Sequence, residues 1–107
     1  MLDEAKLQAL RKGFLEFLVL RIIQRASVYS ADILQQLAAT EFATKDGTLY
    51  PLLSRLRREG LLDYAWQESG SGPPRKYYRL TSAGTERLAE FNAYWKRIQQ
   101  TVESIGG

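Results

Sequence analysis

The sequence contains no cysteine and no histidine. Without a thiol or an imidazole, the chain cannot form a disulfide, a zinc finger or a catalytic triad that uses either group. The motifs of other common chemistries are missing as well, since there is no GxSxG elbow, no SxxK pair and no glycine-rich phosphate loop. We therefore expect no catalytic residue, no metal site and no cofactor, and the protein is predicted not to be an enzyme.

Long apolar runs are also missing, and the N-terminus lacks the order of features that marks a signal peptide. A cytoplasmic protein without membrane contact is the expectation. The length of 107 residues allows one domain, whose core would be only marginally able to stand alone. We therefore expect a single domain over 1–107 that uses its remaining apolar surface to bind a partner.

Charge is unevenly placed along the chain. Residues 45–81 hold seven basic and four acidic side chains, whereas residues 29–44 hold two acidic side chains and no basic one. A basic segment favours a polyanionic partner, although a solvated helix face would give the same excess. The charge alone leaves both interpretations open.

Apolar spacing predicts three helices in the first 60 residues. Over 6–25 the apolar residues recur at intervals near 3.6, which is typical of one long helix. A second helix is expected to begin at Ser30, whose hydroxyl would cap the free backbone N–H groups of the first turn, and to end near Ala39. A third is expected to start close before Pro51, with Thr44 or Asp46 as its cap.

This third helix has one apolar and one polar face. Its apolar positions, spaced i, i+3, i+4 and i+7, are Leu49, Leu52, Leu53 and Leu56. Gly60 is expected to supply a left-handed residue after its end, and Leu61 to close back on Leu56 in a Schellman motif. One face is therefore predicted to be core, and the other is free to bind.

Two short alternating runs follow. Large side chains occupy every second position at Leu62, Tyr64 and Trp66, and again at Lys76, Tyr78 and Leu80, on either side of the loop ESGSGPPR. This pattern predicts a β-hairpin with a Gly/Ser/Pro tip. A pair of helices followed by a basic two-stranded ribbon is the order of a winged helix-turn-helix protein.

A last helix is expected from Ser82 onward. Its apolar residues are spaced alternately by three and four: Leu88, Phe91, Trp95, Ile98, Val102 and Ile105. Nothing else in the chain remains to cover the far end of this stripe, so these six residues are predicted to form a dimer interface. The segments 1–27 and 82–107 are therefore expected to be dimerisation helices, and 28–81 the DNA-binding core and wing.

The motif GTLYPLLSRLRREGLL, followed by RKYYRLTSAG, resembles the PadR family of bacterial transcriptional regulators. GFLEFLVLRII and VYSADILQQL are similar to the family's first and second helices, so the resemblance covers nearly the whole chain. It implies a mainly α-helical fold with a small β-hairpin wing, in the short branch of the family with a single C-terminal helix. At the wing tip the family often has Gly-Arg-Pro-Arg where this chain has Gly72, Pro73, Pro74 and Arg75, so one phosphate contact is expected to be missing.

Residues of the third helix and the wing are predicted to bind DNA: Lys45, Thr48, Tyr50, Ser54, Arg55, Arg75 and Lys76. Lys45 and Thr48 begin the recognition helix and are expected to reach base edges or phosphates. The resemblance implies a phosphate contact for Tyr50, and packing against the second helix is the alternative. Arg57 and Arg58 are expected only to complement the helix dipole. Trp66, Tyr77 and Tyr78 are expected to cover the core.

We expect a sequence-specific, dimeric repressor of transcription that is relieved by a small planar aromatic ligand. The residues predicted to bind it are Trp95, Phe91, Phe14 and Phe17, with two facing indoles at the dimer centre. The alternative is that these indoles simply fill the interface. At the level of function, the alternative is a winged-helix module that binds protein and not DNA.

Overall fold

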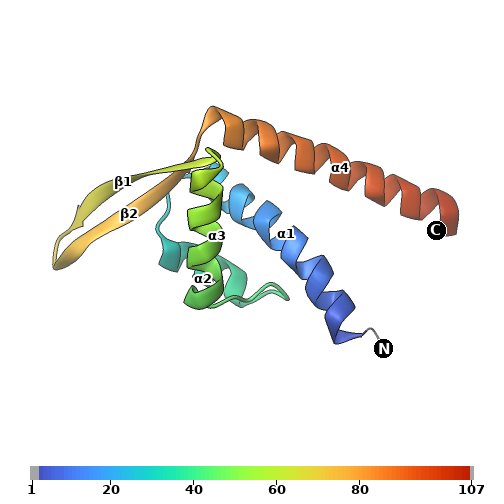
Figure 1. Ribbon diagram of the computed structural model, residues 1–107, viewed down its shortest axis with the longest axis horizontal. Helices are drawn as coiled ribbons and strands as arrows, with labels where there is room; N and C mark the ends of the chain where they lie inside the picture. Colours follow the sequence, from blue (N-terminus) through green and yellow to red (C-terminus); the bar gives the residue numbers. More distant parts are fainter. Residues whose placement is uncertain (1–2, 107) are drawn as a thin grey trace.

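The computed structural model describes residues 3–106 as four helices and one antiparallel hairpin. The elements in chain order are α1 (Glu4–Arg25), α2 (Ser30–Ala38), α3 (Asp46–Arg58), β1 (Leu62–Ser69), β2 (Gly72–Leu80) and α4 (Ser82–Gly106). The hairpin and the far end of α4 project toward opposite ends of the molecule (Figure 1). This confirms the predicted mainly α-helical fold with a hairpin wing. Within these residues no helix is both long and apolar enough to span a membrane.

The core lies where α1, α2, α3 and the base of the hairpin meet. Its fully buried side chains include Leu20 of α1, Ile33 of α2 and Leu53 of α3, each at most 1% exposed. The start of α4 closes this core with Leu88, which is also 1% exposed. Three of the four apolar positions predicted for α3 are also buried in this core: Leu49, Leu53 and Leu56.

Helix α2 begins at Ser30 as predicted, but its cap differs from the prediction. Tyr29 occupies the cap position, and its backbone N–H donates to the Asp32 carboxylate at 3.2 Å. Ser30 is already the first helical residue, and its hydroxyl lies 2.8 Å from the Tyr50 hydroxyl of α3. The prediction that Ser30 caps this helix is therefore wrong, because its side chain bonds to a neighbouring helix.

Helix α3 begins at Asp46, with Lys45 at the cap position and no side-chain capping hydrogen bond. Neither Thr44 nor Asp46 is the cap, so this part of the prediction is wrong. Pro51 lies in the second turn, where it removes one backbone donor and the helix continues. The other end of α3 is as predicted. Gly60 has a φ of 78°, and the Leu61 N–H donates to the Leu56 carbonyl at 3.0 Å.

The hairpin is longer than predicted, and its tip is shorter. Pairing runs from Leu62 opposite Leu80 out to Ser69 opposite Gly72, with an irregularity between Gln67 and Ser69. Only residues 70–71 form the turn, so the predicted eight-residue loop is wrong. At the base, Val28 exchanges two backbone hydrogen bonds with Tyr78, at 3.2 and 2.7 Å. These bonds attach the ribbon to the segment before α2.

Helix α4 is fixed at its start. The Thr81 hydroxyl accepts from the Gly84 N–H at 3.0 Å and donates to the Gly60 carbonyl at 2.6 Å. Gly84 is buried, and a Cβ there would overlap the Leu61 carbonyl oxygen. A glycine at this position is therefore what lets α4 begin so close to the junction of α3 and β1.

Candidate nucleic-acid interface

A groove of about 300 Å³ separates the outer part of α3 from the hairpin. It is lined by Leu53, Ser54, Arg57, Arg58, Tyr64, Lys76 and Tyr78. Three of these side chains are cationic and none is acidic. The structure thus brings together two of the predicted DNA-binding residues, Ser54 of α3 and Lys76 of the wing.

Aromatic rings of the hairpin orient the cations of this groove. The guanidinium carbon of Arg57 lies 4.4 Å from the centre of the Tyr64 ring, and Lys76 Nζ lies 4.6 Å from the same centre. Lys76 Nζ also lies 5.4 Å from the Trp66 ring. These distances are in the range of cation–π attraction. The Tyr64 ring therefore contacts one cation from α3 and one from the wing.

Sequence reasoning missed two cations of this groove, and it misplaced Trp66, which lies next to Lys76 but is not among the lining residues. Arg57 and Arg58 were expected only to complement the helix dipole, but their spacing of i+3 and i+4 from Ser54 was a usable signal that all three share a face. Trp66 was expected to cover the core and is 61% exposed, so that prediction is wrong. Tyr78, in contrast, is buried as expected.

Arg75 lies on the other face of the ribbon. Its guanidinium carbon is 4.8 Å from the centre of the Tyr29 ring, which in turn is 5.4 Å from the Tyr77 ring. Successive residues of a strand point to opposite faces, so Arg75 and Lys76 cannot share a surface. The two predicted wing contacts are therefore placed apart, with Arg75 near the start of α2.

Tyr50 is half-exposed on α3, and its hydroxyl bonds to Ser30 in the first turn of α2. The tyrosine thus packs against the second helix and also presents ring surface to solvent. Lys45 and Thr48 are exposed at the start of α3 and line a different groove, which α1 shares.

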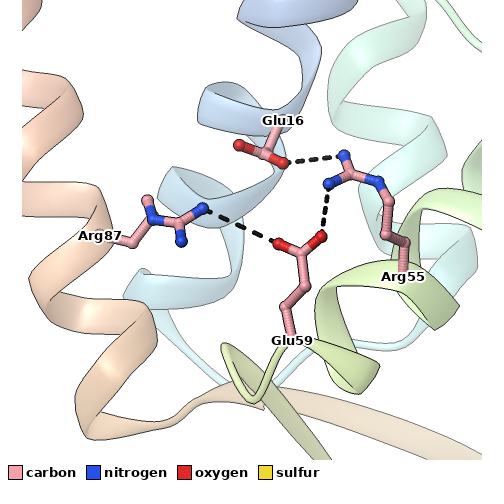
Figure 2. A network of polar contacts seen from close by, with 4 residues as sticks. All are labelled: Glu16, Arg55, Glu59 and Arg87. Carbon is pink, nitrogen blue, oxygen red and sulfur yellow. Dashed lines mark hydrogen bonds and ion pairs between the residues drawn. The ribbon is translucent and has the colours of Figure 1, made fainter.

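Arg55 points away from the groove. Its guanidinium donates to Glu16 of α1 and to Glu59 at the end of α3, both at 2.8 Å (Figure 2). Nη1 of Arg87 in α4 lies 3.9 Å from Oε1 of the same Glu59. The hydrogen bonds to Glu16 and Glu59 raise the pKa of Arg55. Arg55 therefore lies where α3, α1 and α4 meet, and this placement does not support the predicted contact with DNA.

All four predicted ligand-binding aromatics come together between α1 and α4. The Phe14 and Trp95 rings are perpendicular, with centres 5.2 Å apart, and the Phe17 and Phe91 ring centres are 5.7 Å apart. They line an open apolar hollow of about 260 Å³. Over 3–106, no group of three or more acidic side chains is arranged to hold a metal ion.

The arrangement of elements is that of known proteins. The model of the family described as "Transcriptional regulator PadR-like family" matches residues 19–90. A solved PadR-like transcription factor of Bacteroides fragilis is similar with a TM-score of 0.82 and 44% identity, over 97% of this chain and 100% of that one. A PadR-like regulator of Bacillus cereus is similar with a TM-score of 0.80 and 37% identity, over 90% of this chain and 95% of that one. A transcriptional regulator of Mycobacterium tuberculosis is 38% identical over 80 residues, which are 75% of this chain and 72% of that protein.

Proposed function

Because the chain belongs to the PadR-like family of transcriptional regulators, we propose that it binds duplex DNA as a sequence-specific homodimer, with α3 in the major groove and the hairpin along the backbone. The members of this family are DNA-binding regulators and not enzymes. The observation that carries the proposal is the cationic groove between α3 and the hairpin, because it joins the recognition helix to the wing on one surface.

The charges of this groove are available to a polyanion. Within residues 3–106, Arg57, Arg58 and Lys76 take part in no ion pair, in contrast to Arg55. Phosphate contacts position a protein on DNA, and contacts to base edges supply specificity. We therefore assign phosphate binding to Arg58 and Lys76, and base or phosphate contact to Ser54.

A mobility-shift assay with the upstream promoter region of the protein's own gene tests the proposal. The wild-type protein should shift this DNA, and Lys76→Ala should bind all sequences more weakly. The log-log salt slope should be shallower by about 0.9 for each lost phosphate contact, and thus by about 1.8 for the two copies in the dimer. Lys96→Ala, which removes an exposed lysine of α4, is the matched control. A wild-type protein that shifts no DNA at low salt would favour the alternative of a protein-binding module.

The wing assignment has its own test. Because Arg75 and Lys76 lie on opposite faces, the two single variants should differ in their effect on the salt slope. Lys45 or Thr48 variants should instead change the preference among operators. If Lys76→Ala bound the operator as tightly as wild type throughout the salt titration, the hairpin would not contact the backbone as proposed.

The homodimer is supported by the apolar stripe of α4. Leu88 is buried in the chain's own core, but exposure rises to 37% at Trp95, 63% at Val102 and 83% at Ile105. Phe91 and Ile98 are half-buried between these positions. Covering these apolar side chains with a partner would stabilise the dimer, because it removes apolar surface from water. We therefore propose that 28–81 binds DNA while 1–27 and 82–107 form the dimer.

We further propose that a planar aromatic compound relieves repression by binding beside Trp95. The hollow lined by Phe14, Phe17, Phe91 and Trp95 supports this, because it offers ring edges and faces within one apolar surface. Titration with cationic and phenolic aromatics should quench Trp95 fluorescence, with Trp66 as the internal control. Equal quenching and affinity in Trp95→Ala would remove Trp95 from the site and leave the rings as interface packing.

A further inference from the structure

The N-terminal half of α1 has two faces of different chemistry. Leu10, Gly13 and Phe14 line the apolar hollow shared with α4. Gln8, Arg11 and Lys12 line a separate groove of about 660 Å³, whose other wall is the start of α3. An interface that covers the apolar face of α1 would therefore leave the polar face open.

The groove between α1 and the start of α3 is cationic. Lys45 and Thr48 of α3 face it together with Arg11 and Lys12 of α1, over a floor that includes Phe42. No carboxylate lines it. Within the described part of the chain, none of these three cations forms an ion pair. Uncompensated like charges in one groove attract an anion, and a polyanion most strongly.

The position of the groove favours DNA as this anion. Lys45 and Thr48 begin the helix that the proposed function places in the major groove of DNA, so a bound duplex passes next to them. The hairpin and the N-terminal half of α1 extend to opposite sides of α3 (Figure 1). The backbone on the side of α3 away from the wing would thus face Arg11 and Lys12.

We infer that Arg11 and Lys12 bind the phosphate backbone of the same duplex, on the side of each half-site that faces the partner's half-site. The inference rests on the proposed DNA-binding function and extends the DNA surface onto a helix otherwise assigned to dimerisation. The protein would then hold the duplex from both sides of the recognition helix.

A salt titration of operator binding by the full-length Arg11→Gln/Lys12→Gln variant tests the inference. Each lost phosphate contact should make the log-log slope shallower by about 0.9 and weaken binding about tenfold near 0.1 M salt. The charge-preserving Arg11→Lys/Lys12→Arg variant should keep the wild-type slope. Lys96→Gln/Arg97→Gln, which removes the same charge from exposed positions of α4, is the matched control.

Ethylation interference on the operator locates the contact. In the Arg11→Gln/Lys12→Gln variant, interference should disappear at phosphates between the half-sites and persist at those contacted by the wing. If this variant matched the Lys96→Gln/Arg97→Gln control, if the charge-preserving variant were as weak as the glutamine variant, or if interference were lost at the wing, the inference would be wrong while the proposed function stood. A wild-type protein that binds no DNA would overturn the proposed function first.

Discussion

Helices α3 and α4 both carry an apolar stripe, but the chain covers only one of them. Leu49, Leu53 and Leu56 of α3 are at most 1% exposed, whereas the stripe of α4 emerges from the core after Leu88. The difference arises because α3 packs among α1, α2 and the hairpin, while α4 runs past them (Figure 1). A stripe covered within the chain positions the recognition helix, and an uncovered stripe is available for assembly.

The largest effect expected is the loss of a covered side chain. Leu53→Ala should lower the free energy of unfolding by about 2–5 kcal/mol, because it leaves a cavity in the packed core. Ile105→Ala removes similar apolar volume from a position that only the proposed partner covers, so it should weaken assembly and leave the folding of the single chain close to wild type. Urea unfolding of both variants at two protein concentrations measures this. Equal destabilisation by the two variants would contradict the contrast between the helices.

A charge in the uncovered stripe should act on assembly. Val102→Asp removes about 1.5 kcal/mol of apolar burial from each chain of the proposed dimer and adds a carboxylate to the interface, so dimerisation should weaken at least about a hundredfold. Sedimentation at micromolar concentration should give the mass of one chain. Gln100→Asp, an exposed position off the stripe, is the control and should sediment as wild type. A wild-type protein that sediments with the mass of one chain would contradict the proposed dimer.

The smallest effect expected is a change in how the free energy of unfolding depends on pH, and it concerns the buried core. Burial raises the pKa of Tyr78 above its ordinary value of 10.0, so the folded state favours the neutral phenol. The resulting stability is fully present below the pKa of the unfolded chain and is lost as pH rises through the folded pKa. Tyr78→Phe should therefore flatten the fall in unfolding free energy at alkaline pH. Identical pH dependence in the variant and wild type would show that Tyr78 makes no such contribution.

Features that depend on nearby residues could be predicted from the sequence. The helical segments and the Gly60 turn follow from apolar spacing and from one glycine. The cap of α2 was missed because the Ser30 hydroxyl bonds to Tyr50, which is 20 residues away. Likewise, one partner of Arg55, Glu16, is 39 residues distant. Neither of these long-range contacts leaves a local pattern, although the second partner of Arg55, Glu59, lies four residues on and was a usable signal.

The separation of Arg75 from Lys76 is a different kind of miss. Strand alternation alone places consecutive residues on opposite faces, so the sequence held the signal. The extent of the hairpin, in contrast, could not be predicted from the sequence. Gly and Pro residues indicated a loop, but backbone pairing continues to Ser69 and Gly72 because the strands already run together from Leu62. A ladder established at the base thus outweighs the local preference at the tip.

The two prolines near the tip also restrict how the ribbon can associate. A two-stranded ribbon has open edges, and an open edge can recruit strands from other molecules into aggregates. On β2, Val28 already occupies the backbone groups of Tyr78, and Pro73 and Pro74 have no N–H to offer to another strand. On β2 this leaves the short stretch between Pro74 and Tyr78 as a template for edge-to-edge growth. The hairpin can therefore extend far from the core without β2 offering a long edge for aggregation.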